Sequence, residues 1–199
     1  MTSRGHVSLA MPAEPTYVPN MTAALITADQ LLHMSIPDKR VELVRGVLVV
    51  REPPGYRHGR IAAELVFQLA KHVKAAGIGQ VVVGDAGFQV TSDPDTVRGP
   101  DIAFIHAGRV PDSQTRGFPL LGPDLVVEVL SPNDRPGETL AKVGDWLEAG
   151  TKLVWVIDPE RRLARVYRHD VSETSINEEE ELDGEGVLPG FACPLASIL

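Results

Sequence analysis

The sequence predicts a single domain of the α/β or α+β class, in which a mixed β-sheet is flanked by helices. Three observations lead to this prediction. The chain has 199 residues, 43% of them hydrophobic, which is enough to bury one substantial core. Two segments carry apolar residues at helical spacing, and several short runs rich in valine and isoleucine are typical of strands. A strand, a helix and a second strand follow one another within residues 123–158, which predicts a parallel strand pair.

The first half of the chain supplies helix and hairpin signals. We expect a flexible tail over residues 1–22 and the folded domain over residues 23–199. Thr27, with Gln30 three residues later, predicts a capped helix ended by Pro37. Two β-branched runs in 41–52 surround Arg45-Gly46 and predict a hairpin. Apolar residues then recur every four positions over 56–76, which predicts a long helix that stops at Gly77.

The second half is richer in strands. Four further segments are interpreted as strands, namely 79–91, 101–106, 123–130 and 152–158. Between the last two, residues 136–150 predict a helix ended by Gly150. From Leu163 onward the pattern alternates and carries turn residues, so we expect antiparallel strands and a short terminal helix.

Composition excludes several classes of protein. Cys193 is the only cysteine, so neither a disulfide framework nor a cysteine-rich zinc site is available. No run approaches the roughly 18 apolar residues of a membrane-spanning helix, and the N-terminus lacks the apolar region of a secretory signal. The sequence motifs of P-loop and dinucleotide-binding proteins, serine hydrolases and zinc proteases are also missing. We therefore expect a cytoplasmic protein without a membrane partner.

The net charge of −8 argues at first against a protein that wraps nucleic acid with a basic surface. The charge is uneven, however. Eight acidic residues and no Lys or Arg lie between 170 and 185, so the rest of the chain is neutral; such a run is usually a solvated loop or edge strand. Residues 38–74 hold eight bases against four acids, which is either a phosphate-facing surface or scattered solubilising charge.

Two acidic residues stand inside apolar strands. Glu128 shares a strand face with Val126 and Leu130, where an unpaired carboxylate costs several kcal/mol, so a cation or a hydrogen-bond donor must meet it. Asp101 begins a second apolar strand. Two carboxylates that converge near the ends of adjacent strands suit Mg²⁺. The structural alternatives are that Asp101 caps a turn after proline and that Glu128 simply pairs with an arginine.

Three other polar residues have ordinary interpretations from spacing alone. Lys142 falls at the edge of the buried face of its helix, but Glu138 lies four residues earlier, which favours a solvated helix pair. Glu42 is expected at a half-exposed hairpin position. His58, at the start of the long helix, is expected to cap it or to face solvent.

Five segments nevertheless stand in a recognisable order: VELVRGVLVV, PPGYRHGRIAAELVFQL, GPDIAFI, GPDLVVEVLSPND and ETLAKVGDWLEAGTKLVWVIDPERR. In this order and content the chain resembles the Uma2 family of restriction-endonuclease-like proteins, which belongs to the PD-(D/E)XK nuclease superfamily. The resemblance extends over Leu25–Leu199, and the segment PDLVVEVLSP followed by AGTKLVWVIDP is its most specific part.

The resemblance implies a restriction-endonuclease-like core with Asp101 and Glu128 as metal ligands. The superfamily pattern places a lysine two residues after the glutamate, and that position here is Leu130. In the Uma2 family the lysine comes from the next helix, which assigns the role to Lys142. Glu42 and His58 match recurrent family positions and are supporting candidates for the catalytic site.

The leading hypothesis is hydrolysis of DNA phosphodiesters that depends on Mg²⁺, or on Mn²⁺ in its place. Asp101, Glu128 and the carbonyl of Val129 would hold the metal, and Lys142 would orient or deprotonate a water or offset phosphate charge. One alternative is a catalytically silent module that binds nucleic acid or protein, which the missing strand lysine favours. Another is a hydrolase of small phosphodiesters, which suits an acidic protein. A homodimer is expected, because many nucleases of the superfamily cleave both strands as pairs.

Overall fold

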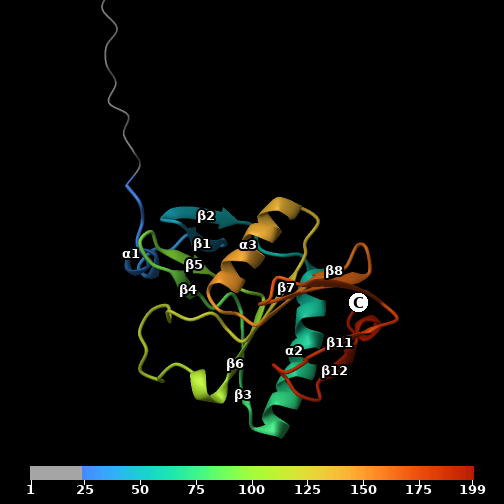
Figure 1. The fold of residues 1–199 in the computed structure, drawn as a ribbon. Coiled ribbons are helices and arrows are strands. Elements are labelled where there is room, and N and C mark those ends of the chain that lie inside the picture. Colours follow the sequence, from blue (N-terminus) through green and yellow to red (C-terminus); the bar gives the residue numbers. More distant parts are fainter. Residues whose placement is uncertain (1–23) are drawn as a thin grey trace, which may run out of the picture.

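The computed structural model describes residues 24–199, and the tail expected over 1–22 lies outside these described residues. It confirms the predicted fold class, a single domain of mixed sheets flanked by a few helices (Figure 1). The helices are α1 (Ala28–Leu32), α2 (Tyr56–Ala76) and α3 (Pro136–Glu148), with short 3₁₀ turns η1 (Ala107–Arg109) and η2 (Leu195–Ser197). None of the helices within residues 24–199 combines the length and the apolarity needed to cross a lipid bilayer.

A four-stranded antiparallel sheet is built around the predicted hairpin, in the order β2-β1-β5-β4. Its strands are β1 (Arg40–Val44), β2 (Val47–Arg51), β4 (Phe88–Thr91) and β5 (Thr96–Arg98). Arg45 and Gly46 both adopt positive φ angles, the conformation that a tight two-residue hairpin turn requires. The hairpin prediction is therefore confirmed, and its turn fixes the register that places Glu42 opposite Val49.

A six-stranded sheet forms the centre of the domain, in the order β10-β9-β8-β7-β6-β3. Its strands are β3 (Gly79–Val83), β6 (Ile102–His106), β7 (Leu125–Val129), β8 (Leu153–Asp158), β9 (Leu163–Arg168) and β10 (Glu173–Asn177). β7 and β8 pair in parallel through the α3 crossover, as predicted, and every other pair in this sheet is antiparallel. Acidic Glu173 begins the edge strand β10, in agreement with the edge interpretation of the acidic run.

Helices α2 and α3 cover opposite faces of the six-stranded sheet. The α2 residues Ile61, Leu65 and Leu69 pack on the face that presents Val127 and Trp155. Val143 and Trp146 of α3 pack on the other face. The C-terminal hairpin of β11 (Glu181–Asp183) and β12 (Ala192–Pro194) joins the α2 side of the core, as Figure 1 shows.

Three sequence-based expectations need correction. Residues 79–91 do not form one strand but two, because Gly84 and Asp85 take positive φ and turn the chain from the six-stranded sheet into the four-stranded one. Strand β5, between two turn-forming segments, was not predicted. Helix α1 has the expected Thr27 capping box but ends at Leu32, several residues before Pro37.

Truncation of a buried α2 side chain tests this packing. Leu65 is fully buried, so Leu65→Ala should lower the free energy of unfolding by about 2–5 kcal/mol in urea titrations. Phe67 lies two residues along the same helix but is 60% exposed, so Phe67→Ala should change it by only about 0.5 kcal/mol. Equal losses in the two variants would contradict the assigned buried face of α2.

Candidate active site

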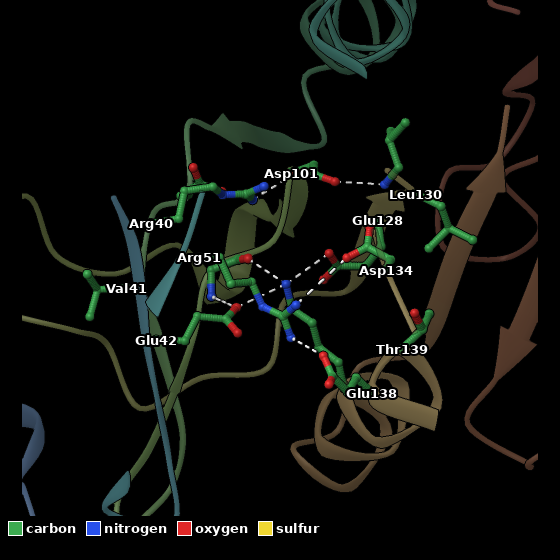
Figure 2. A pocket seen from close by; sticks show the side chains of 14 residues that line it. Arg40, Val41, Glu42, Arg51, Asp101, Glu128, Leu130, Asp134, Glu138 and Thr139 are labelled. Atoms are coloured by element: carbon green, nitrogen blue, oxygen red, sulfur yellow. Dashed lines mark hydrogen bonds and ion pairs between the residues drawn. The ribbon is translucent and has the colours of Figure 1, made fainter. Parts of the chain in front are cut away.

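A pocket of about 70 Å³ opens where the two larger sheets meet the N-terminal half of α3. Figure 2 shows Glu42 and Glu128 directed toward its centre from opposite sides, with Arg40 and Asp101 along one edge. The residues that line it come from segments far apart in the chain: Arg40, Val41, Glu42, Arg51, Asp85, Gly99, Asp101, Glu128, Val129, Leu130, Asp134, Glu138, Thr139 and Lys142.

Asp101 and Glu128 converge as the strand pattern predicted. Strands β6 and β7 are antiparallel neighbours, with Ile102 opposite Val127, so the residue before Ile102 lies across from the residue after Val127. Both carboxylates are buried. The sheet register therefore fixes their proximity, because any slip by one residue would turn Glu128 to the other face.

Glu128 meets both kinds of partner that its burial required. Its Oε2 accepts a hydrogen bond from Lys142 Nζ at 2.9 Å, and its Oε1 accepts one from the indole N–H of Trp146 at 3.0 Å. Burial raises the pKa of Glu128 to about 7, and the negative charges of Asp101 and Glu42 add to the rise while Lys142 opposes it. Lys142 is thus the cation that offsets the cost of burying the Glu128 carboxylate.

Lys142 lies in this pocket and not on a solvated helix face, so the prediction of an ion pair with Glu138 is wrong. Its ammonium donates to Glu128 and to the carbonyl of Gly99 at 2.8 Å, and it forms an ion pair with Glu42 Oε1 at 3.0 Å. Burial alone would lower the pKa of Lys142, but the surrounding carboxylates raise it above its ordinary value. The group is therefore held as a cation at neutral pH.

Glu138 pairs instead with Arg51 of β2, at 3.0 Å. The helix spacing alone favoured Lys142 as its partner because two residues four positions apart lie on the same helix face. In the folded domain, Arg51 of the four-stranded sheet lies beside that face of α3 and is the partner of Glu138.

Glu42 is buried, so the expectation of a half-exposed hairpin position is wrong as well. One oxygen accepts the N–H of Gly99 at 3.0 Å, and the other accepts Arg98 Nη1 at 2.9 Å. Burial opposes ionisation, but the charges of Lys142 and Arg98 outweigh it and lower the pKa of Glu42 to about 2. Glu42 is thus a fixed anion that holds Lys142 against β1.

His58 faces inward from the first turn of α2, contrary to the expectation of a cap or a solvent-facing residue. Its Nε2 lies 3.0 Å from Asp101 Oδ2, and the N–H of Val129 donates to the same oxygen at 2.7 Å. Burial would raise the pKa of Asp101, but the His58 hydrogen bond and charge and the Val129 N–H lower it. Both groups fix the orientation of the Asp101 carboxylate.

Several site residues were missed by sequence reasoning. Arg40 Nη2 donates to Asp101 Oδ1 at 2.9 Å and also pairs with Asp85. Arg98 bridges Glu42 and Asp145, at 2.9 and 2.5 Å. One sequence signal could have indicated them. Each arginine adjoins a β-branched residue in a short strand, and a cation that becomes buried in a strand needs an acidic partner.

The basic segment 38–74 is largely paired within the molecule. Five of its bases contact acceptors elsewhere in the chain: Lys39 with Glu52, Arg40 with Asp101, Arg51 with Glu138, Arg57 with Glu160, and Arg60 with the carbonyl of Leu199. This outcome favours the interpretation as internal and solubilising charge over an extended phosphate-facing surface.

Comparison with solved structures places the fold. The domain is similar to a crystal structure titled as a putative nuclease belonging to DUF820 from Anabaena variabilis. The TM-score is 0.78 at 21% sequence identity, over 87% of this chain and 97% of that one. A comparison with curated proteins gave no match.

Comparison with protein families gives a match over residues 28–196 to the Uma2 family, described as “Putative restriction endonuclease”. The match takes in both larger sheets, α2, α3 and every residue of the pocket. Because it covers most of the chain, the resemblance found in the sequence is confirmed, and the protein belongs to the Uma2 family.

Proposed function

We propose that this protein is an endonuclease that hydrolyses DNA phosphodiester bonds with the help of a divalent cation. The observation that carries the proposal is the convergence of Asp101 and Glu128 on Lys142 in a surface pocket. Membership of the Uma2 family supports the same assignment. DNA as the substrate and a homodimer as the working unit remain predictions.

The donor set of the pocket fits a hard divalent cation such as Mg²⁺ or Mn²⁺. Mg²⁺ is commonly bound through one or two carboxylates and keeps several waters, which a phosphate oxygen can replace. Asp101, Glu128 and the carbonyl of Val129 offer such oxygens. Within residues 24–199, no three His, Cys, Asp or Glu side chains are already grouped to hold a metal. In this proposal Asp101 and Glu128 are the two side-chain ligands.

A bound divalent cation supplies Lewis acidity, which polarises the phosphate and lowers the pKa of water. The residues of the chain provide the remaining electrostatics. Water attacks phosphorus and loses a proton, a new P–O bond forms, and the bond to the leaving sugar oxygen breaks. The leaving oxygen gains a proton and departs as a hydroxyl. Lys142 and the pocket arginines Arg40 and Arg51 are placed to offset the negative charge that builds on the phosphate oxygens. Because Lys142 is held as a cation, charge compensation suits it better than removal of a proton from water.

A catalytically silent binding module is the second candidate. It is favoured by the engagement of Arg40 with Asp101 and of Lys142 with three acceptors, since these contacts compensate the carboxylates without a metal. Metal binding and cleavage separate the two candidates.

Cleavage should require the three central residues. With Mg²⁺ or Mn²⁺, the purified protein should nick supercoiled plasmid, and Asp101→Asn, Glu128→Gln and Lys142→Met should each slow nicking by about 10²-fold or more. Glu148→Gln, at an exposed position of the same helix as Lys142, is the matched control and should cleave at the wild-type rate. Identical rates for the wild type and all three central variants would refute the nuclease proposal.

Isothermal titration calorimetry should detect Mn²⁺ binding that depends on Glu128. Glu128→Gln removes one anionic ligand and should abolish the binding heat, whereas Glu148→Gln should preserve it. A wild-type protein that shows no Mn²⁺ binding, or binding that Glu128→Gln leaves intact, would favour the silent module.

Glu42 should stabilise the folded state through its ionised form. Because its pKa falls from 4.5 unfolded to about 2 folded, this contribution is complete above about pH 5 and is lost as the pH falls toward 2. Glu42→Gln should therefore cost about 3 kcal/mol at neutral pH, and the difference from wild type should shrink on acidification. Denaturant titrations over a pH series measure this, with Glu52→Gln, at an exposed position beyond β2, as the control. A constant difference down to pH 2 would show that the charge of Glu42 is not the cause.

A further inference from the structure

A second and larger cavity, of about 340 Å³, adjoins the candidate active site. It shares Leu130, Asp134 and Thr139 with the smaller pocket, so the two spaces are neighbours with a common wall. Figure 2 shows these three residues on the side of the pocket away from the β1 strand. The remaining lining comes from the start of α3, from β8 and β9 and from the turn between these strands: Pro136, Val156, Asp158, Arg161, Leu163, Arg165 and Tyr167.

The strand register relates this cavity to the catalytic candidates. Glu128 of β7 lies opposite Val156 of β8, which in turn lies opposite Arg165 of β9, so the three form one row across the sheet. With strands about 4.8 Å apart, the Cα atom of Arg165 lies roughly 10 Å from that of Glu128. A chain-like substrate with one phosphate at Glu128 can therefore extend along the row to Arg165.

The walls of the cavity combine apolar surface with polar edges. Leu130, Val156, Leu163 and the Tyr167 ring supply the apolar part. At the rim, Arg161 is held by Asp158 at 3.0 Å. Arg165 has Glu173 as its acidic neighbour, but at 3.7 Å the two do not form a hydrogen bond, and both side chains are about half exposed. Arg165 is thus the rim cation best placed to bind an anionic ligand.

Size distinguishes the two spaces. The pocket of about 70 Å³ holds a few waters or part of a phosphate, whereas about 340 Å³ is within the range of small-molecule sites and accepts a nucleobase with its sugar. The bases of an intact duplex are stacked inside the helix, so a duplex would present its sugar-phosphate backbone and the base edges in its grooves, but no free base face, to these apolar walls. A base enters such a cavity only after it leaves the stack.

We infer that this cavity is a nucleotide subsite, which holds one unpaired base of the DNA strand whose phosphodiester lies at Asp101 and Glu128. Arg165 binds the phosphate of that nucleotide, and the apolar walls and Tyr167 contact the base. The inference rests on the proposed nuclease function for the nature of the strand. It makes single-stranded or locally opened DNA the substrate class. The pairing of Lys and Arg side chains in segment 38–74 agrees with this substrate class. Duplex binding relies on many phosphate contacts, and few of these side chains are left to make them.

Fluorescence anisotropy without added metal tests the subsite apart from cleavage. The probe is a short fluorescein-labelled single strand of DNA. Two unlabelled competitors are used: a duplex of the same sequence, and a single strand of the same sequence that carries abasic positions. The wild type should bind the single strand about tenfold more tightly than either competitor. Arg165→Gln should weaken binding about tenfold, and Leu163→Trp, which fills the cavity without changing charge, should abolish the preference for strands that carry bases.

Arg162→Gln is the matched control, since Arg162 also lies beside β9 but pairs with Glu178 and does not line the cavity. Thermal melts of each variant check that the domain is folded. Unchanged binding in folded Arg165→Gln and Leu163→Trp, or equal affinity for the duplex and the single strand, would overturn the subsite even if the wild type cleaves DNA. Cavity-dependent binding in a protein that never cleaves would support the subsite and refute only the proposed hydrolysis.

Discussion

The Lys142 ammonium is the contact on which the site depends, because it joins three parts of the fold. It comes from α3 and binds Glu128 on the six-stranded sheet, Glu42 on the four-stranded sheet and the Gly99 carbonyl between β5 and β6. Leaving a buried carboxylate without its cation typically costs about 3–5 kcal/mol. The two sheets and α3 must therefore dock in one arrangement, and that arrangement places Glu128 beside Asp101.

The need to neutralise buried carboxylates also explains where the arginine side chains of the chain lie. Arg98 neutralises Glu42, Arg40 neutralises Asp101, and Arg51 binds Glu138 at the pocket edge. The acidic run, by contrast, lies toward the C-terminal edge of the molecule, where Glu173 begins an edge strand. An acidic protein can in this way place cationic side chains around one pocket without a broad basic surface.

The sequence was a good guide wherever local periodicity decides the outcome. It predicted α2 from Tyr56 to about Ala76, the Arg45-Gly46 hairpin and the β7–α3–β8 crossover, because buried faces and turn conformations leave local signatures. It predicted wrongly for Lys142, Glu42 and His58 when spacing alone was used. Their partners are distant in the chain. Lys142 contacts Glu128, 14 residues away; Glu42 contacts Arg98, 56 residues away; and His58 contacts Asp101, 43 residues away. Only the family resemblance carried that long-range information, and neither route indicated Arg40 or Arg98.

Leu130 connects the absence of a strand lysine to the shape of the molecule. It follows Glu128 by two residues and so lies on the same sheet face, at the position where the superfamily pattern places lysine. With the cation supplied from α3, this strand position is apolar, and Leu130 lines both the small pocket and the larger cavity. A lysine at the same position would put a charge at the boundary, which would favour a second phosphate over a base. With its cation on the helix, the protein has an apolar wall beside the small pocket, and such a wall would suit the proposed subsite for an unpaired base.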